Sequence, residues 1–413
     1  MKIVHISTYD HGGAGLATYR LHRGLLAAGI ESLMLVSSKS QNDDTVFQLH
    51  PDQKLLYHPP RNVVLNKIQK VMRRRGRFLT DAEKSDKAMS RVHSLFPDVY
   101  YTSPVSTFDI SKNRFVQEAD IIHLHWVQNF LNYNSFFENV KKPIVWTFHD
   151  LNPLYGGFHY KIPQSQHYND LKHIEDKFYT IKKKAINQAT DLSIVAISKQ
   201  MHNLIANHEI YSDKPIYDIP NSVNGANFIQ HDRNTVRKIL NIPLNDKVFL
   251  FSSLDLNEER KGLNILIATL ELLNLDNALL ICLGDGSVPS NKKIKIRHFS
   301  PVSDTEWLSM LYSAADYFVA PSLEESFLQT ALESLCCGTP VIMTPVGIGC
   351  ELITEHNGIL CTGFSSESLA DGIMKALGCT YDRDEMRRDV LERYGGDVVT
   401  KRYLNMYNTI IMQ

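Results

Sequence analysis

Residues 316–358 contain the pattern that most constrains the fold of this chain. An apolar run at 317–320 is followed by a Pro-Ser loop, a helical segment with two glutamates, a Gly-Thr-Pro stop and a second apolar run. Short apolar runs bounded by turn residues indicate buried strands, and the segment between them has the length and the stop signal of a helix. The stretch therefore predicts a strand–helix–strand unit.

Alternating strand and helix patterns recur in both halves of the 413-residue chain. This length predicts two domains of ordinary size, and the alternation predicts an α/β protein with two Rossmann-like domains. We place the boundary in the polar segment at about 222–246. The first domain is then 1–222, the second is 246–395, and a final helix occupies 396–413.

The loop that enters the helix of the opening unit has the features of an anion site. Free backbone N–H groups at a helix N-terminus hold phosphate in parallel α/β units, and here they would come from Ser326, Phe327 and Leu328. Glu325 precedes them and Glu333 lies roughly 12 Å of helix rise further on. A nucleoside diphosphate sugar could reach both carboxylates, or Glu325 could lie before the helix and project across the phosphate. The alternative is two solvated glutamates on an amphipathic helix.

Two loops of the first half also follow predicted strands. Gly12 and Gly13 stand between a strand and a helix, where glycine lets the backbone approach a ligand closely; the alternative is a turn needed only for packing. His149 follows the strand at 143–148, at the carboxyl end where α/β sheets place ligands. A structural histidine that hydrogen-bonds to the backbone is the alternative at that position.

Composition excludes several classes of function. A net charge of −1 argues against a nucleic-acid partner for the whole molecule. The N-terminal segment is predicted to be a strand rather than a secretory signal, and no apolar run approaches the roughly 20 residues of a membrane span, so we expect a cytoplasmic protein. The six cysteines show no zinc-type spacing, and we expect them to be reduced and mostly buried.

A basic segment at 61–79 carries seven Lys and Arg residues and no acidic residue. Val64, Ile68 and Val71 recur there at helical spacing, which predicts an amphipathic basic helix. Such a helix suits the anionic surface of a membrane and would make the protein peripheral at the inner face of the cell membrane. The alternatives are a solvated helix packed on its own domain, or a basic lip for an acceptor that carries a pyrophosphate.

The two glutamates, with Pro-Ser-Leu before them at 321–323 and Gly-Thr-Pro after them at 338–340, resemble the donor-site signature of the family 4 retaining glycosyltransferases with the GT-B fold. The stretches 12–24 and 147–160 resemble the subgroup of that family found in colanic-acid and other surface-polysaccharide pathways. The resemblance implies two Rossmann-like domains facing a central cleft, with the helix at 396–413 crossing back onto the first domain.

The resemblance also implies a reaction and roles for individual residues. A hexose would pass with retention from a UDP-sugar or GDP-sugar donor to a glycan or lipid-linked acceptor, without metal or other cofactor, in assembly of lipopolysaccharide, capsule or a related polysaccharide. Lys261 and Arg260 would stabilise the departing diphosphate, a task for which fixed positive charge is suited. Glu333 would bind the ribose hydroxyls, Glu325 the hydroxyls of the donor sugar, and His149 the sugar near its reacting carbon.

The chain departs from the family pattern at four residues. Ser252 and Ser253 replace a Gly-Arg pair, Phe158 replaces a cysteine, and Leu328 replaces a glycine, which is expected to tighten the pocket beside the sugar. Two other functions remain open at this point. A GT-B sugar-nucleotide epimerase would lack this arrangement of glutamates and the Lys-Gly motif, and a non-catalytic module would bind nucleotide sugars without turnover.

Overall fold

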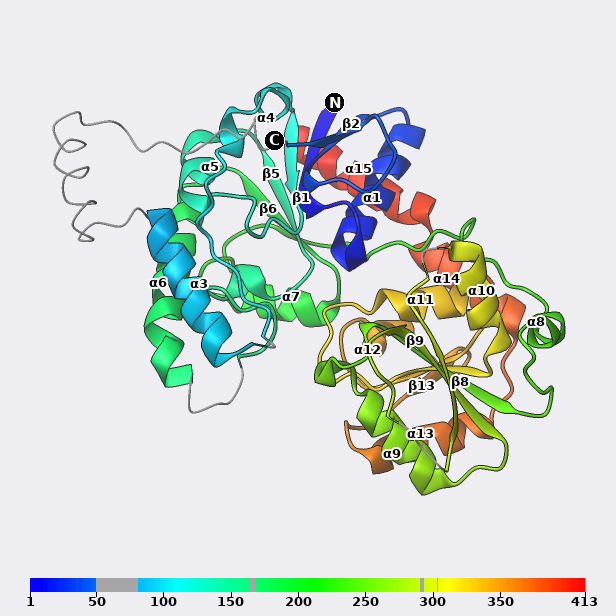
Figure 1. Ribbon diagram of the computed structural model, residues 1–413. Coiled ribbons are helices and arrows are strands. Elements are labelled where there is room, and N and C mark those ends of the chain that lie inside the picture. Colours follow the sequence, from blue (N-terminus) through cyan, green and yellow to red (C-terminus); the bar gives the residue numbers. More distant parts are fainter. Residues whose placement is uncertain (50–80, 98, 163–167, 290–292, 303, 413) are drawn as a thin grey trace, which may run out of the picture. The chain divides into compact units, whose positions relative to one another are not determined.

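The computed structural model describes residues 1–413 except 50–80, 98, 163–167, 290–292, 303 and 413 (Figure 1). The predicted basic helix at 61–79 lies outside the described residues. The chain forms two compact units. Unit 1 comprises Met1–Ala196, His202–Asp218 and Tyr403–Gln413, and unit 2 comprises Ile197–Met201 and Ile219–Arg402.

Unit 1 is built on a seven-stranded parallel sheet in the order β3-β2-β1-β4-β5-β6-β7. Its central strands are apolar runs and are buried almost throughout, as expected for a parallel sheet with helices on both faces. The strands are β1 (Lys2–Tyr9), β2 (Glu31–Ser38), β3 (Val46–Gln48), β4 (Ile121–Leu124), β5 (Ile144–Phe148), β6 (Leu192–Ala196) and β7 (Ile216–Asp218). The helices are α1 (Gly12–Ala27), α3 (Asp81–Leu95), α4 (Arg114–Glu118), α5 (Tyr133–Asn139), α6 (Tyr168–Ile186) and α7 (Lys199–Ala206).

Unit 2 contains a six-stranded parallel sheet in the order β10-β9-β8-β11-β12-β13. The strands are β8 (Lys247–Asp255), β9 (Ala278–Asp285), β10 (Lys295–Phe299), β11 (Tyr317–Ala320), β12 (Val341–Met343) and β13 (Gly358–Leu360). The helices are α8 (Arg233–Ile239), α9 (Leu263–Leu273), α10 (Thr305–Ala314), α11 (Gln329–Cys336), α12 (Gly349–Leu352), α13 (Ser366–Leu377) and α14 (Arg383–Tyr394). The predicted strand–helix–strand unit is β11, α11 and β12.

The strand order reverses once in each sheet. In unit 1 the chain runs outward from β1 to β3 and then resumes on the other side of β1 with β4, and in unit 2 the same change occurs between β8 and β11. Open α/β sheets bind ligands outside the carboxyl ends of the strands at such a switch point. The two switch points therefore mark where the candidate site residues should be sought, and the prediction of an α/β fold with two Rossmann-like domains is confirmed.

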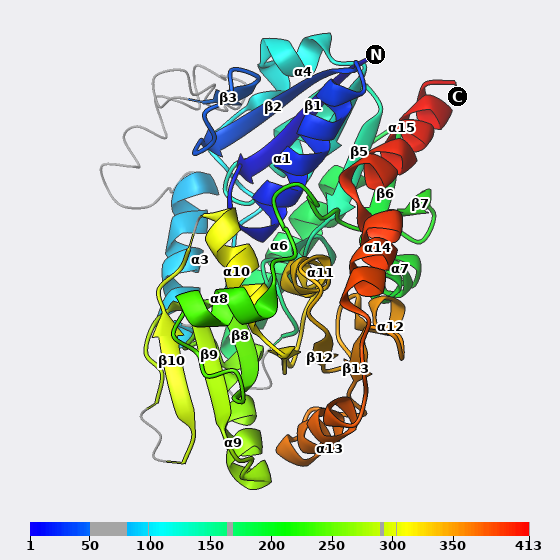
Figure 2. The same cartoon turned by 90° about the vertical axis from the view of Figure 1, so that its right-hand side faces the viewer.

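The last helix, α15 (Gly396–Met412), begins in unit 2 and ends in unit 1. The Tyr407 hydroxyl lies 2.6 Å from Nδ1 of His123 in β4, and the Tyr403 hydroxyl lies 3.2 Å from Oγ1 of Thr147 in β5. These contacts hold the last turns of α15 against unit 1, as the sequence predicts (Figure 2).

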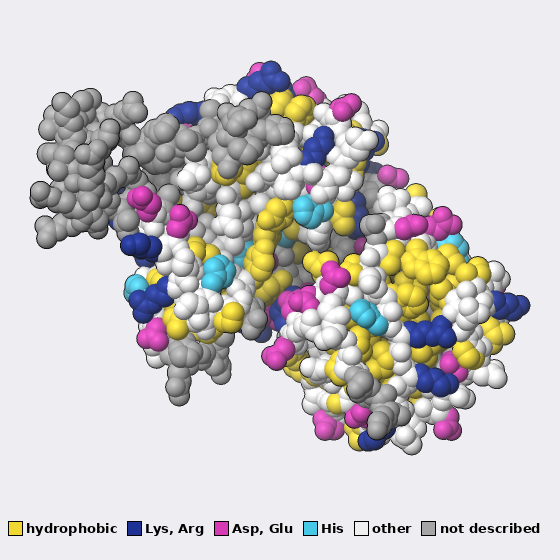
Figure 3. Space-filling view, viewed as in Figure 1, with side chains coloured by type: hydrophobic (Ala, Val, Ile, Leu, Met, Phe, Trp, Pro, Cys, Tyr) yellow, Lys and Arg dark blue, Asp and Glu magenta, His cyan; other side chains and the backbone are white. Residues whose placement is uncertain are grey.

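The surface and the cysteines agree with the composition. On the face shown in Figure 3, positive and negative side chains are interspersed over both units, in keeping with the near-neutral net charge. All six cysteines are free thiols, and four of them are buried. Among the described residues, no helix is both long and apolar enough to cross a bilayer.

Candidate functional site

A short 3-10 turn, η4 (Glu259–Lys261), carries the two predicted cations of unit 2. It ends at Gly262, which has a left-handed φ of 77°, and a Cβ there would lie 2.2 Å from the carbonyl oxygen of Pro321. Only glycine permits so close a contact between the end of η4 and the loop that follows β11. The Leu323 N–H donates to the Arg260 carbonyl oxygen at 2.8 Å and fastens the two loops together.

The two loops bring four charged side chains into one cluster. Lys261 Nζ lies 2.6 Å from Glu325 Oε1, Arg260 lies 3.4 Å from the other oxygen of that carboxylate, and Arg260 also pairs with Glu258 at 2.6 Å. The Ser322 hydroxyl donates to Glu325 at 3.0 Å. Burial opposes ionisation of Glu325, but Lys261 and Arg260 outweigh it and hold the pKa of the carboxyl below its ordinary value. Three of the predicted site residues therefore lie together at the switch point of unit 2.

This cluster is balanced in charge, a property that the sequence motif does not reveal. Two cations face two carboxylates, and the side chains of Lys261 and Glu325 are only 20% and 9% exposed. A bound diphosphate would have to replace the Glu325 carboxylate as the partner of Lys261, or share the lysine with that carboxylate. The pairing of Lys261 with Glu325 depends on a contact between loops 64 residues apart in the chain, so reasoning from the sequence did not find this ion pair.

The loop at 325–328 shows which of the two predicted arrangements is correct. Helix α11 begins at Gln329, so Glu325 lies before the helix, and Ser326, Phe327 and Leu328 precede its first residue. Leu328 adopts a left-handed φ of 81° at the N-cap position. The predicted N–H donors of Ser326, Phe327 and Leu328 therefore lie in the loop that leads into α11, not in the first turn of the helix.

Glu333 lies on the inner side of α11. Its side chain is largely buried, at 9% exposure, and its Oε2 lies at the limiting distance of 3.5 Å from the Tyr312 hydroxyl. Because Glu325 is equally buried, the interpretation of two solvated glutamates on an amphipathic helix is wrong.

In unit 1, the glycine-rich turn opens α1 at the carboxyl end of β1. Gly12 and Gly13 are exposed, and a Cβ at either position would meet no atom within 4 Å. Gly15, in contrast, sits so close to β1 that a Cβ would lie 2.7 Å from the Tyr9 carbonyl oxygen. The third glycine is therefore required for packing, whereas the first two leave open space at the switch point of this sheet.

His149 follows β5 and joins a row of buried histidines. Its Nε2 lies 3.1 Å from Nδ1 of His125, and Nε2 of His125 lies 3.0 Å from Nδ1 of His5. His123 pairs with His5 in the strand register, so all four side chains share one face of the sheet. Burial lowers the pKa of His149 to about 4, which leaves it neutral at pH 7. The spacing of two residues between His123 and His125, at the end of β4, was the sequence signal for this row, and our sequence reasoning missed it.

Three of these histidines could hold a metal ion. One ring nitrogen each of His5, His123 and His125 lies within 4.8 Å of the others. His5 Nδ1 bonds to His125 Nε2 within the row, and His123 bonds to the hydroxyls of Tyr407 and Thr147 at 2.6 and 2.8 Å. A metal would have to displace some of these bonds, and the trio includes no carboxylate to balance its charge. Hydrogen bonds therefore account for much of the row, but they leave the buried His5 Nε2 without a partner among the described residues.

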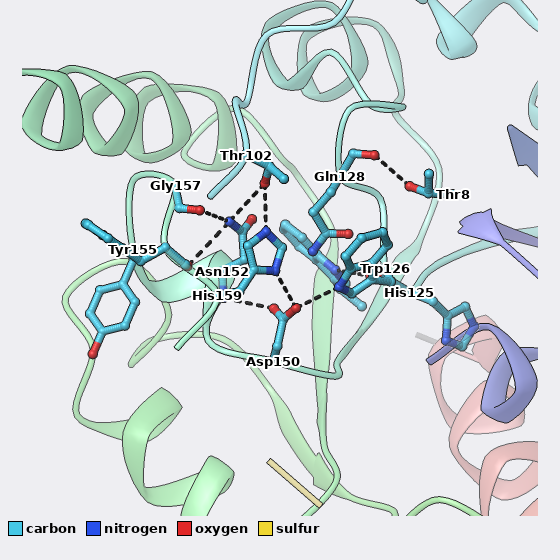
Figure 4. A network of polar contacts seen from close by, with 12 residues as sticks. Thr8, Thr102, His125, Trp126, Gln128, Asp150, Asn152, Tyr155, Gly157 and His159 are labelled. Carbon is cyan, nitrogen blue, oxygen red and sulfur yellow. Dashed lines mark hydrogen bonds and ion pairs between the residues drawn. The ribbon is translucent and has the colours of Figure 1, made fainter. Parts of the chain in front are cut away.

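Asp150, the residue after His149, anchors a second network (Figure 4). Its carboxylate accepts from Trp126 Nε1 and pairs with His159 Nδ1, each at 2.7 Å. Nε2 of His159 lies 2.8 Å from the Thr102 hydroxyl. The buried Lys182 donates to the carbonyl oxygens of Asn152 and Tyr155, the latter at 2.9 Å, and burial lowers its pKa to about 7. The loop after β5 is thus held by satisfied polar contacts.

Parts of this chain are similar in sequence to known glycosyltransferases. Residues 246–378 match the model of the family described as glycosyl transferases group 1. An uncharacterized glycosyltransferase of Methanocaldococcus jannaschii is 25% identical over 311 residues, which cover 71% of this chain and 76% of that protein. A D-inositol 3-phosphate glycosyltransferase of Corynebacterium aurimucosum is 28% identical over 207 residues, which cover 45% of this chain and about half (48%) of that enzyme.

Solved structures show the same fold over nearly the whole chain. Sucrose-phosphate synthase from Thermosynechococcus elongatus aligns over 100% of both chains with a TM-score of 0.64 and 18% identity. The Anabaena protein HepE in complex with UDP-glucose aligns over 99% of this chain and 100% of its own, with a TM-score of 0.64 and 17% identity. The fold is GT-B, and residues 246–378 are similar to group 1 glycosyltransferases.

Proposed function

We propose that this protein is a retaining, metal-independent hexosyltransferase that uses a UDP-sugar or GDP-sugar. Its acceptor is a glycan or lipid-linked glycan in surface-polysaccharide assembly. The observation that carries the proposal is the cluster of Arg260, Lys261 and Glu325 at the switch point of unit 2, within the segment that matches the family model. Two structural relatives support it: HepE with UDP-glucose, and WaaG, a glycosyltransferase involved in lipopolysaccharide biosynthesis, with a TM-score of 0.54 over 97% of this chain.

In this proposal, the donor diphosphate is bound at the mouth of β8 and β11. Lys261 turns from Glu325 to the diphosphate or bridges the two, and Arg260 supports the same charge. Glu325 accepts from hydroxyls of the donor sugar, and Glu333 accepts from the ribose hydroxyls. Positive charge fixed where the leaving diphosphate gains negative charge lowers the barrier more than the same charge in water would.

The unit 1 residues complete the proposal on the acceptor side. The exposed turn at Gly12 and Gly13 gives close backbone approach to the donor phosphate, and neutral His149 bonds to the sugar near the reacting carbon. The acceptor attacks the face that the diphosphate leaves, and the leaving phosphate oxygen accepts the acceptor proton. This route retains the anomeric configuration and requires no protein base.

The first test is binding of UDP, GDP and CMP and their sugars by isothermal titration. Lys261→Ala and Glu333→Ala should each weaken binding of the cognate nucleotide by about 1.5–3 kcal/mol, because each removes a hydrogen bond to a charged group. Lys375→Ala is the matched control, because this lysine is exposed on α13 of the same unit. Unchanged affinity in both site variants would contradict the assignment.

The second test concerns the reaction itself. Incubation of the full chain with the donor that binds and with membrane or glycan extracts, in the presence of EDTA, should yield a glycoside with the anomeric configuration of the donor by proton NMR. An inverted product, or activity that EDTA abolishes, would contradict retention or metal independence. Nucleotide-sugar binding without transfer to any extract would indicate a non-catalytic binding module.

A further inference from the structure

Three aromatic rings gather at the switch point of unit 1. Tyr9 is the last residue of β1, and Trp126 follows the neighbouring strand β4 by two residues. Their ring centroids lie 5.5 Å apart with an interplanar angle of 31°, and the Tyr100 ring lies 5.8 Å from the indole. Tyr100 is 51% exposed, and Tyr9 and Trp126 are half-buried. An aromatic surface is therefore open to solvent where α/β sheets bind ligands.

A network of buried polar groups fixes the orientation of the Trp126 indole. Trp126 Nε1 donates to Asp150, which also pairs with His159, and Thr102 is bonded to the other nitrogen of that histidine (Figure 4). Asp150, His159 and Thr102 are 7%, 1% and 5% exposed. Burying a carboxylate is unfavourable unless its bonds are satisfied, and this satisfied network orients a ring that is itself partly exposed. The indole is thus in place before any ligand binds, which reduces the entropy lost on binding.

The charge of the surface limits the ligand. The three side chains are uncharged, and the neighbouring carboxylate of Asp10 accepts from the backbone N–H groups of Ser40 and Gln41 at 2.8–2.9 Å. Phosphate or pyrophosphate would find no cation among these rings. A pyranose ring fits better, because it is neutral and combines an apolar C–H face with hydroxyls at its edge, as the tyrosines combine an apolar ring with a polar tip.

We propose that Tyr9, Tyr100 and Trp126 form an acceptor subsite that binds the C–H face of a neutral pyranose ring. The proposal rests on the proposed glycosyl transfer and names the acceptor class as a saccharide. Asp150, which fixes the indole, directly follows His149 in the chain, so the aromatic subsite and this histidine both belong to the carboxyl ends of neighbouring strands in the same sheet.

Saturation-transfer NMR on the full chain tests this subsite with methyl pyranosides of glucose, galactose and mannose. At least one glycoside should receive saturation at its ring C–H protons, and the free base uracil, which unlike uridine carries no sugar, is the flat non-saccharide comparison. Its dissociation constant should rise about fivefold in Tyr100→Ala and about tenfold or more in Trp126→Ala, in line with the free energy of an aromatic contact. Trp307→Ala in unit 2 is the matched control for Trp126→Ala, since both indoles are half-buried.

Each outcome bears on the subsite separately from the donor site. Titration with the cognate nucleotide sugar reports on the donor site and involves none of the three rings, so failure of the proposed function appears as loss of nucleotide binding in the unaltered protein. Absence of saturation transfer to every glycoside, or equal transfer in the unaltered protein and in Tyr100→Ala, overturns the subsite. Transfer to uracil that is lost in Trp126→Ala, without transfer to glycosides, also overturns it. Tyr100→Ala keeps the test valid if Trp126→Ala fails to fold, because Tyr100 is half exposed.

Discussion

Replacement of Glu325 by glutamine should separate binding of the nucleotide from transfer of the sugar. The carboxylate lies 2.6 Å from Lys261 Nζ, its side chain is 9% exposed, and its lowered pKa keeps it ionised at pH 7. A diphosphate that recruits Lys261 must break or share this bond. Hydrogen bonds to charged groups contribute about 1.5–3 kcal/mol and neutral ones about 0.5–1.5 kcal/mol. Glutamine should therefore hold Lys261 about 1 kcal/mol less tightly, and bare UDP or GDP should bind roughly fivefold more tightly.

The same substitution should slow transfer, because an amide offers one acceptor oxygen to the donor-sugar hydroxyls where the carboxylate offers two. Isothermal titration with the bare nucleotide and a coupled assay of nucleotide release measure the two effects on one preparation. Glu355→Gln is the control, since that glutamate lies in the same unit, is 88% exposed and is placed in no part of the donor site. If Glu325→Gln binds the bare nucleotide with unchanged or lower affinity, Lys261 does not leave Glu325 for the diphosphate, and the reasoning is refuted.

Three further predictions concern stability, each measured by urea denaturation. Gly262→Ala would place a Cβ 2.2 Å from a backbone carbonyl at a φ of 77°, so it should destabilise unit 2 by about 1–3 kcal/mol, whereas Gly13→Ala has open space and should be nearly neutral. Burial lowers the pKa values of His22 and His149 to about 4, so between pH 6.5 and 4 the unfolded chain binds more protons than the folded one. The free energy of unfolding should therefore fall as the pH is lowered from 6.5 through 4, by up to about 3 kcal/mol for His22. A flat profile of stability against pH would contradict this. Tyr407→Phe removes the 2.6 Å bond to its histidine partner in β4 and should destabilise unit 1 by about 1–3 kcal/mol; an unchanged midpoint would show that the bond contributes little.

The sequence predicted those features that depend on local pattern. The strand at 317–320 coincides with β11, because its apolar run has turn residues on both sides. The row of histidines was not predicted, because it requires the pairing of β1 with β4 and the return of α15 to unit 1. The ion pair of Lys261 with Glu325 likewise depends on the close approach of two loops at Gly262. Contacts of this kind arise from tertiary packing, which a single sequence does not display.

Leu328 shows how a departure from the family pattern can be accommodated at the candidate donor site. Its φ of 81° is left-handed, a conformation that costs a residue with a side chain roughly 1–2 kcal/mol and glycine very little. The leucine side chain is 8% exposed and belongs to the apolar core of unit 2, and its full burial contributes about 1.5–3 kcal/mol. The two effects nearly balance, so the leucine is tolerated, but its side chain ties the loop at 325–328 to the core. Glycine would leave this loop free to move, whereas leucine holds the backbone next to Glu325 in one position.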